Sequence, residues 1–200
     1  MEKEIYKEDL RTVRTRKFLS NALLTLLEKH SIDEITIHDI CEKAMVHRTT
    51  FYTHFNDKYD LFAYMLSKVR EEIYERTQHT TDFDTPKDMY MGIAREVIDF
   101  IEENRKQLTA ILKNNSNEIV LSILYETIQA SVLDLLELNK HKENFQVPLE
   151  VASSFYTGGF IALVIWWLKN YNKYKKDQLL AYCDILIDEK ICTLCASHSV

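Results

Sequence analysis

Glycine and proline are scarce along the whole chain, and this scarcity limits the folds that it can adopt. Only three glycines and two prolines occur among 200 residues. A β-sandwich needs many tight turns and a phosphate-binding loop needs closely spaced glycines, so the chain has little material for either. Hydrophobic residues make up 46% of the sequence, which is enough for a sizeable core. The sequence therefore predicts an all-α fold.

Apolar residues recur at helical spacing and predict about nine helices. The first apolar stripe consists of Phe18, Ala22, Leu23, Leu26 and Leu27. Thr36 is a candidate N-cap with Asp39 three residues later, and Asn56 or Asp57 can cap the fourth helix. The expected helices cover about 11–29, 37–44, 47–55, 57–78, 86–103, 105–113, 117–139, 148–170 and 176–196.

Charge is distributed unevenly, and this limits where a nucleic acid could bind. The net charge is −6. Residues 11–58 nevertheless hold eight Lys or Arg against six Asp or Glu, with four histidines in addition, whereas residues 61–200 hold fifteen against twenty. Electrostatics therefore permit a nucleic-acid contact only near the N-terminal end.

The third expected helix has an unusual polar face. A projection at 100° per residue puts Phe51 and Phe55 on one side and Thr49 and Thr53 on the other, flanked by Tyr52 and Thr50. Glu and Lys are the usual choice for a solvated helix face, and each threonine costs a few tenths of a kcal/mol of helix propensity relative to them. Short hydroxyls instead suit close contact with base edges and phosphates.

Two short helices joined by a tight turn make a helix-turn-helix. The stretch "TIHDICEKAMVHRTTFYTHFNDKYDL" resembles the DNA-binding domain of the TetR family of bacterial transcriptional regulators, over roughly residues 11–66. The segment "FYTGGFIALVIWWLKN" is similar to the penultimate helix in one branch of that family. One position departs from the pattern: Met45 stands in the turn where the family usually has glycine, at a cost of about 1 kcal/mol if the conformation is left-handed.

The resemblance implies roles for particular residues. It places base-reading side chains at Arg48, Thr49, Thr50 and Thr53, and a further one at His38. It places phosphate-contacting or helix-positioning side chains at Thr36, Tyr52, His54 and Lys58. Two of these readings stay open, because His54 also suits packing and His38 also suits plain solvent exposure.

The same resemblance implies two modules and a mode of assembly. Residues 1–56 form the DNA-binding domain, helix 57–78 connects, and residues 57–200 form an effector-binding and dimerisation domain. A homodimer through the last two helices would read a near-palindromic operator on double-stranded DNA. The expected function is repression, relieved by a small-molecule or protein effector. The candidate effector pocket consists of Tyr90, Phe100, Tyr125, Phe155, Tyr156 and Trp166, any one of which is also explained as core or dimer interface.

Other classes of function find less support. No Gly-rich phosphate loop, HExxH motif or nucleophile elbow occurs, so we expect no enzyme and no cofactor. Cys192, Cys195 and His198 lack a fourth ligand, so no metal site is expected. The apolar run 155–168 is too short for a membrane span and no export signal is present, which favours a cytoplasmic protein. A protein-binding adaptor and, more remotely, a small helical enzyme are the alternatives.

Overall fold

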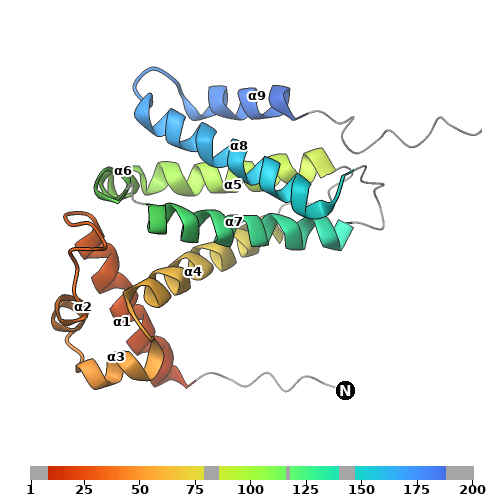
Figure 1. Cartoon of the computed structure of the whole chain (residues 1–200). Helices are drawn as coiled ribbons and strands as arrows, with labels where there is room; N and C mark the ends of the chain where they lie inside the picture. Colours follow the sequence, from red (N-terminus) through yellow and green to blue (C-terminus); the bar gives the residue numbers. More distant parts are fainter. Residues whose placement is uncertain (1–8, 79–85, 116–117, 140–146, 188–200) are drawn as a thin grey trace, which may run out of the picture. The chain divides into compact units, whose positions relative to one another are not determined.

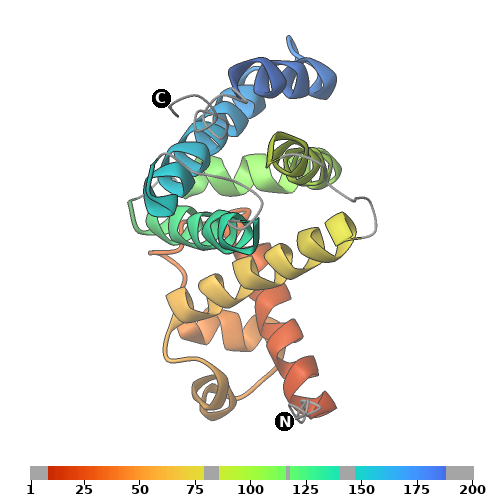
Figure 2. The same cartoon turned by 90° about the vertical axis from the view of Figure 1, so that its right-hand side faces the viewer.

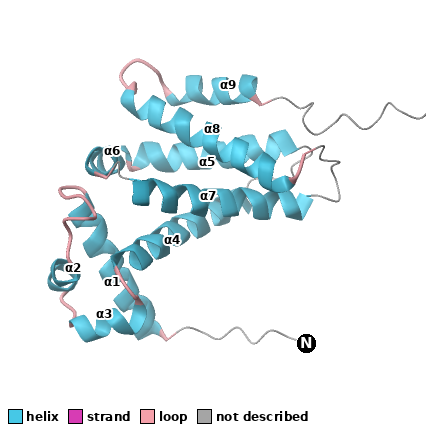
Figure 3. Ribbon diagram, viewed as in Figure 1, coloured by secondary structure: helices cyan, strands magenta, loops and turns pink. Residues whose placement is uncertain are grey.

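The computed structural model describes residues 9–78, 86–115, 118–139 and 147–187, and every regular element in these ranges is a helix (Figure 3). This confirms the expected all-α fold. In chain order the helices of the described ranges are α1 (Leu10–Leu27), α2 (Ile37–Ala44), α3 (Arg48–His54), α4 (Lys58–Gln78), α5 (Pro86–Glu103), α6 (Arg105–Asn114), α7 (Glu118–Asn139), α8 (Leu149–Lys169) and α9 (Lys176–Leu186) (Figure 1).

Side-chain caps explain where several helices begin. Asp9 accepts a hydrogen bond from the Arg11 backbone N–H at the start of α1. Thr36 and Asp39 form the expected capping box of α2. Asp57, one of the two candidate caps of α4, accepts from the backbone N–H groups of residues 59 and 60, both at 2.8 Å. These contacts satisfy N–H groups that have no partner inside the helix.

The end of α9 differs from the expected range. We expected a helix over 176–196, but it ends at Leu186, and Ile187 has an extended backbone with φ −89° and ψ 109°. Ile185 is 77% exposed and Leu186 is 64% exposed, so the last apolar residues of the pattern are not held by burial in the chain. The expected continuation beyond 187 lies outside the described residues.

Two compact units divide the chain, and their boundary is not a single point in the sequence. The first unit comprises Met1–Leu66 and Gln107–Val120, and the second comprises Ser67–Lys106 and Leu121–Val200. Most of α6 therefore packs with the N-terminal helices, although it lies about 40 residues beyond them in the sequence. The functional division at residue 56 stays a prediction.

The core of the first unit comes from α1 to α4 and the loop before α2. Leu19, Leu23, Ile40, Phe51 and Leu61 are fully buried, and α1 packs against both α2 and α3. The first apolar stripe is confirmed at Ala22, Leu23 and Leu27, which are buried, but it is wrong at Phe18. Phe18 is 55% exposed, and its neighbour Leu19 takes the core position because it lies one turn from Leu23 on the same face.

The second unit is a bundle of helices (Figure 2). Its core includes Trp167. Trp167 on α8 is fully buried and packs with Ile98 of α5 and Leu179 of α9. Its indole Nε1–H donates to the carbonyl of Tyr174 at 3.1 Å, which fixes the turn between α8 and α9. The buried donor is thus satisfied by a backbone acceptor.

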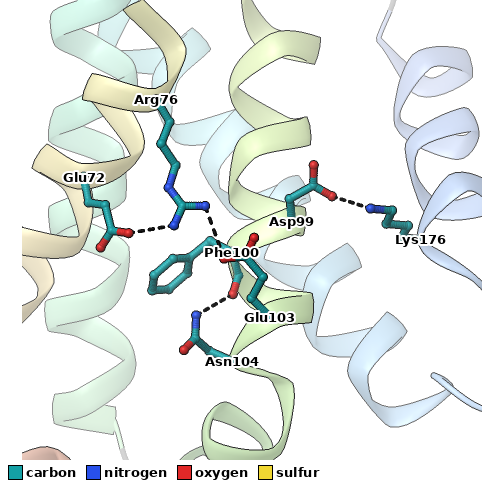
Figure 4. Close-up of polar contacts among 7 residues, drawn as sticks. All are labelled: Glu72, Arg76, Asp99, Phe100, Glu103, Asn104 and Lys176. Carbon is teal, nitrogen blue, oxygen red and sulfur yellow. Dashed lines mark hydrogen bonds and ion pairs between the residues drawn. The ribbon is translucent and has the colours of Figure 1, made fainter. Parts of the chain in front are cut away.

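Charged residues link helices inside the second unit (Figure 4). The guanidinium of Arg76 on α4 donates to Glu72 at 2.7 Å and to Glu103 of α5 at 3.3 Å, and these bonds raise the pKa of Arg76. Lys176, at the start of α9, donates to Asp99 of α5 at 2.7 Å, and the pKa of Lys176 is raised accordingly. All these groups are partly solvated, so each pair contributes little alone.

Candidate nucleic-acid interface

The third helix is anchored by two aromatic side chains. Phe51 is fully buried and Phe55 is 4% exposed, with their ring centroids 5.9 Å apart. Phe55 also packs at 5.3 Å against Tyr64 of α4, and the Arg16 guanidinium from α1 lies 5.4 Å from the Tyr64 ring. Contacts from α1 and α4 therefore fix the inner side of α3, as the helical projection predicted.

The opposite side of α3 faces solvent. Arg48, Thr49, Tyr52 and Thr53 are exposed, whereas Thr50 is half-buried. The Thr53 hydroxyl donates to the Thr49 carbonyl at 2.9 Å, so its oxygen remains able to accept a hydrogen bond. The face consists of one guanidinium, one phenol and threonine hydroxyls on a short, well-anchored helix. Such a surface can approach the floor of a DNA groove.

The turn between α2 and α3 is a Schellman motif that contains a left-handed methionine. Met45 has φ 55° and ψ 43°. Its N–H bonds to the carbonyl of Glu42 at 3.1 Å, and the N–H of Val46 bonds to the carbonyl of Cys41 at 3.0 Å. Met45 is 92% exposed, so no side-chain packing offsets the backbone strain. The turn therefore keeps the geometry that usually carries glycine.

The start of α2 places two of the expected DNA contacts at the surface. Thr36 and His38 are both exposed. The Thr36 hydroxyl donates to Asp39 Oδ2 at 2.6 Å and accepts from the Asp39 N–H at 3.2 Å. The pKa of Asp39 is lowered mainly by the hydrogen bond that the Thr36 hydroxyl donates, and next by the one that the Thr36 backbone N–H donates. His38 Nε2 lies 4.0 Å from a carboxylate oxygen of Glu42.

Lys58 and His54 contact other parts of the chain, unlike the solvent-facing residues on the open face of α3. The Lys58 ammonium donates to the carbonyls of Asp33 at 3.0 Å and Ile35 at 2.9 Å, in the loop before α2. This geometry agrees with a helix-positioning role, one of the two that the resemblance implied. His54 is half-buried, and its ring centroid lies 6.4 Å from that of Phe55, which agrees with its packing role.

Sequence reasoning missed a polar contact between α6 and the end of α1. Three amide side chains of residues 107–115 bond to residues 27–32, and among them Asn115 is only 1% exposed. The expected helices 105–113 and 117–139 leave the asparagines at 114 and 115 in the break between them. The adjacent asparagines were the available signal, but their partners lie more than 80 residues away.

The aromatic residues expected to line an effector pocket divide into separate places in the second unit. Tyr90 and Tyr156 are together, with ring centroids 5.3 Å apart, and Phe155 lies 5.8 Å from Tyr156. Burial raises the pKa of Tyr90. Phe100 instead lies under the guanidinium of Arg76 at 5.9 Å (Figure 4).

The other two expected pocket residues have further partners. The Tyr125 hydroxyl donates to the carbonyl of Ser154 at 3.3 Å, and Trp166 packs on Tyr174 with 4.8 Å between ring centroids. A groove of about 360 Å³ between α5 and α9 contains none of the six. Its lining residues are Lys87, Asp88, Met91, Arg95, Asp177, Leu180, Ala181 and Asp184.

One face of α8 is apolar and open. Every third or fourth residue along it is exposed, and this face consists of Val151, Phe155, Gly159, Ala162 and Trp166. A Cβ atom added at Gly158 or Gly159 would meet nothing within 4 Å. By length and composition alone α8 could cross a membrane. Its opposite face, however, contributes the buried Trp167 to the core of the second unit.

Two family models match the chain. Residues 20–65 match the model described as bacterial regulatory proteins of the tetR family, and residues 87–189, slightly more than half of the chain, match a transcriptional regulator C-terminal region. The chain belongs to the TetR family of bacterial transcriptional regulators. This confirms the family that the helix-turn-helix motif indicated.

Individual relatives agree with TetR-family membership. An uncharacterized HTH-type transcriptional regulator of Bacillus subtilis, YxbF, is 35% identical over 91 residues, which make up 45% of this chain but only 23% of that protein. A TetR transcriptional regulator from Streptococcus agalactiae 2603V has a TM-score of 0.64 at 19% identity, with 89% of this chain and 96% of that chain covered. FadR from Bacillus subtilis, solved with stearoyl-CoA, has a TM-score of 0.54 at 13% identity, with 84% and 94% covered.

These comparisons settle the TetR fold but not the individual contacts. The DNA-contacting and effector-pocket residues stay predictions, and structures at such low identity support the fold alone. TetR-family regulators are generally not enzymes. Among the described residues no cluster of three or more His, Cys, Asp or Glu could hold a metal ion. Cys192, Cys195 and His198 lie outside the described residues.

Proposed function

We propose that the chain is a cytoplasmic, dimeric, sequence-specific repressor that an effector releases from its operator. The observation that carries the proposal is the exposed face of α3, where Arg48, Thr49, Tyr52 and Thr53 project from a helix anchored by buried phenylalanines. Arg48 and the threonines are assigned to base edges in the major groove, together with the half-buried Thr50. Tyr52 is assigned to a phosphate.

The residues around this face complete the proposed reading surface. Thr36 and His38 bring the start of α2 to the DNA, as the second group of contacts. Lys58 supports the proposal differently, because its ammonium holds the loop that precedes α2 and so positions that helix. His54, the last residue of α3, lies beside Phe55 and is assigned a role in orienting that helix.

A selection experiment with matched variants tests the DNA contacts. Operators are selected from random DNA, and the base preference is then compared for the wild type, Thr49→Ala, Thr53→Ala and Tyr52→Phe. Losing a base contact should cost about 1–3 kcal/mol at one base pair, a factor of roughly 5 to 150. Tyr52→Phe should instead weaken binding to all sequences alike, because a phosphate contact carries no sequence information.

The control for Thr53→Ala is Thr25→Ala. Thr25 on α1 makes the same kind of bond, with its hydroxyl donating to the carbonyl four residues earlier at 2.8 Å. Thr25→Ala therefore reproduces the loss of a helical side-chain bond away from the proposed reading face, and it should leave operator binding unchanged. Unaltered affinity and base preference in Thr49→Ala and Thr53→Ala would remove the proposed reading role.

The open face of α8 supports the dimer. Phe155 is 69% exposed and Val151 is 54% exposed, and on α9 the side chain of Ile185 is 77% exposed. Contiguous apolar surface of this kind is typical of an interaction site. The empty space beside Gly158 and Gly159 leaves room for the helix of a second copy to approach. We therefore assign α8 and α9 to a four-helix interface between two copies.

A charge on this face tests the dimer. Phe155→Glu should convert the dimer into a monomer by light scattering at micromolar concentration, and operator affinity should fall because one head makes few base contacts. Tyr74→Glu is the control, because Tyr74 on α4 is also a large exposed aromatic residue, at 44% exposure, away from the α8 face. A wild-type monomer, or a Phe155→Glu dimer as stable as the wild type, would contradict the assignment.

The effector is proposed to bind the second unit. FadR, the neighbour solved with stearoyl-CoA, supports a small molecule with an extended apolar part. In this chain Tyr90 of α5 and Tyr156 of α8 offer one aromatic pair. An effector that prefers a conformation unmatched to the operator would shift the population and release the DNA. Metabolites that dissociate the selected operator complex would identify it.

A further inference from the structure

A buried amide at the end of α6 binds the backbone that leaves α1. Asn115 Oδ1 accepts a hydrogen bond from the N–H of Ile32 at 2.6 Å. Its Nδ2 donates to the carbonyls of Leu27 and His30, both at 3.3 Å, and to that of Ile111 in its own helix at 3.0 Å. All of these residues belong to the first compact unit. Two of the four bonds are thus to the segment that joins α1 to α2, and a third is to the last residue of α1.

Two further amides of α6 reach the same segment. Asn114 Nδ2 donates to the carbonyl of Glu28 at 2.9 Å. The Gln107 side-chain amide hydrogen-bonds to the carboxylate of Glu28. The contact surface between α6 and the end of α1 therefore includes a polar network, which we call the amide clamp (Gln107, Asn114 and Asn115).

Neither a carboxylate nor an aliphatic side chain can replace Asn115 in this position. Ile32 is fully buried, so its N–H would lie without a partner if Asn115 lost its acceptor oxygen. The neighbouring carbonyls require donors at the same time. An amide supplies both, whereas a carboxylate would face those carbonyls with negative charge. An aliphatic side chain would remove the acceptor of the Ile32 N–H and the side-chain donor of the Leu27 and His30 carbonyls. Buried unpaired backbone groups are strongly disfavoured, so the segment would rearrange.

The clamped segment leads directly to the DNA-facing end of α2. On its other side, Lys58 donates to the carbonyls of Asp33 and Ile35, and the Tyr59 hydroxyl donates to Asp33 Oδ1 at 2.7 Å. The next residue, Thr36, is the N-cap of α2. Residues 28–35 therefore bond to the amide clamp on one side and to the first turn of α4 on the other. The segment with these bonds ends directly before α2 begins.

We propose that Asn115 is a positioning residue for DNA recognition. It acts through residues 28–35 and sets where Thr36 and His38 lie relative to α3, although Asn115 itself is buried and distant in sequence from the reading helices. The inference rests on the DNA-binding function proposed above. Since Asn115 carries no charge, it affects the fit to the operator and leaves the electrostatic attraction to DNA unchanged.

The test compares specific and non-specific DNA binding in Asn115→Leu, at a temperature where circular dichroism shows full helix content. Operator affinity should fall at least tenfold, whereas affinity for random DNA and its salt dependence should stay within twofold, because no cationic group is lost. The control is Asn104→Leu. Asn104, which directly follows α5, makes the same bond to the carbonyl four residues earlier, at 2.9 Å, but lies in the second unit (Figure 4).

Hydrogen exchange gives a readout that does not depend on DNA. In Asn115→Leu the amides of Ile32 and of the first turn of α2 should exchange at least tenfold faster, with α3 little changed. Unaltered exchange at the start of α2 would overturn the positioning role of Asn115, whether or not the wild type binds DNA. If the wild type bound no DNA, that result alone would contradict only the proposed DNA-binding function. Wild-type operator affinity in a folded Asn115→Leu variant would also overturn it, and would leave Asn115 with a purely structural role.

A milder variant covers the case in which Asn115→Leu does not fold. Asn114→Ala removes only the bond to the Glu28 carbonyl, which is partly accessible to solvent. It should lower operator affinity about threefold and again spare binding to random DNA. Equal losses for operator and random DNA would contradict positioning, because they would indicate a general loss of folded protein.

Discussion

Replacing Met45 with glycine should stabilise the first unit. Among the described residues Met45 alone combines a side chain with a positive φ. A left-handed conformation costs a non-glycine residue about 1–2 kcal/mol. Glycine removes that strain but loses about 0.5–1 kcal/mol through its greater backbone freedom in the unfolded chain. Because Met45 is 92% exposed, almost no burial is lost. The net gain should be about 0.5–1 kcal/mol.

Amide exchange at the turn measures this gain. The Val46 N–H is bonded to the Cys41 carbonyl, so it exchanges only when the Schellman turn opens. In Met45→Gly the exchange rate of the Val46 N–H should fall by a factor of about two to five. This factor corresponds to the expected net gain in stability of the turn. The protein should also unfold at a higher urea concentration, with the slope of the transition unchanged.

Met45→Ala separates backbone strain from side-chain effects. Alanine keeps the Cβ atom that is crowded in the left-handed region, so its stability should stay within about 0.5 kcal/mol of the wild type. The reasoning is refuted if glycine and alanine have the same effect, or if glycine destabilises the turn.

Two further predictions concern the capping box at the start of α2 and the contact of Lys58 with the loop before α2. The pKa of Asp39 is lowered by Thr36, so the carboxylate stabilises α2 above the unfolded carboxyl pKa and this stabilisation disappears as the pH falls through the lower folded value. Thr36→Val should raise the pKa of Asp39 toward the ordinary value of 3.8 in an NMR titration, and an unmoved pKa would contradict the capping box. Lys58→Met keeps the aliphatic stem but loses two bonds to loop carbonyls, and should destabilise the first unit by about 1–2 kcal/mol in urea unfolding. Lys68→Met, which loses an exposed pair with Glu71, should cost about 0.5 kcal/mol or less, and equal losses would exclude the loop contact as the cause.

Most of the fold could be predicted from the sequence because its signals are local. Apolar stripes at helical spacing gave the ranges of α1 to α8 to within about two residues. Thr36 and Asp57 begin α2 and α4 as caps, and Pro86 begins α5 at a position where its missing N–H is not needed. The buried side of α3 followed from the spacing of its phenylalanines alone.

Features that depend on distant partners could not be predicted in this way. Phe18 and Leu19 are adjacent and both apolar, so only the packing of α1 against α2 and α3 decides which of them is buried. The partner of Asn115 at Ile32 is 83 residues away, and no periodicity connects them. The long side chain of Lys58 could extend into solvent or toward the nearby loop. In the structure its ammonium bonds to the carbonyls of residues 33 and 35, and the sequence around Lys58 does not indicate these partners.

The position of α6 affects how chains of this kind can be recombined. The family segment that ends at residue 65 contains the whole proposed reading surface, and the segment 87–189 contains the amide clamp. A chimaera that joins this head to the C-terminal segment of another regulator would therefore bring foreign side chains to the Ile32 N–H, however well the junction in α4 was chosen. Head and clamp should be exchanged together, and natural variation at residues 107–115 should follow variation at residues 27–32.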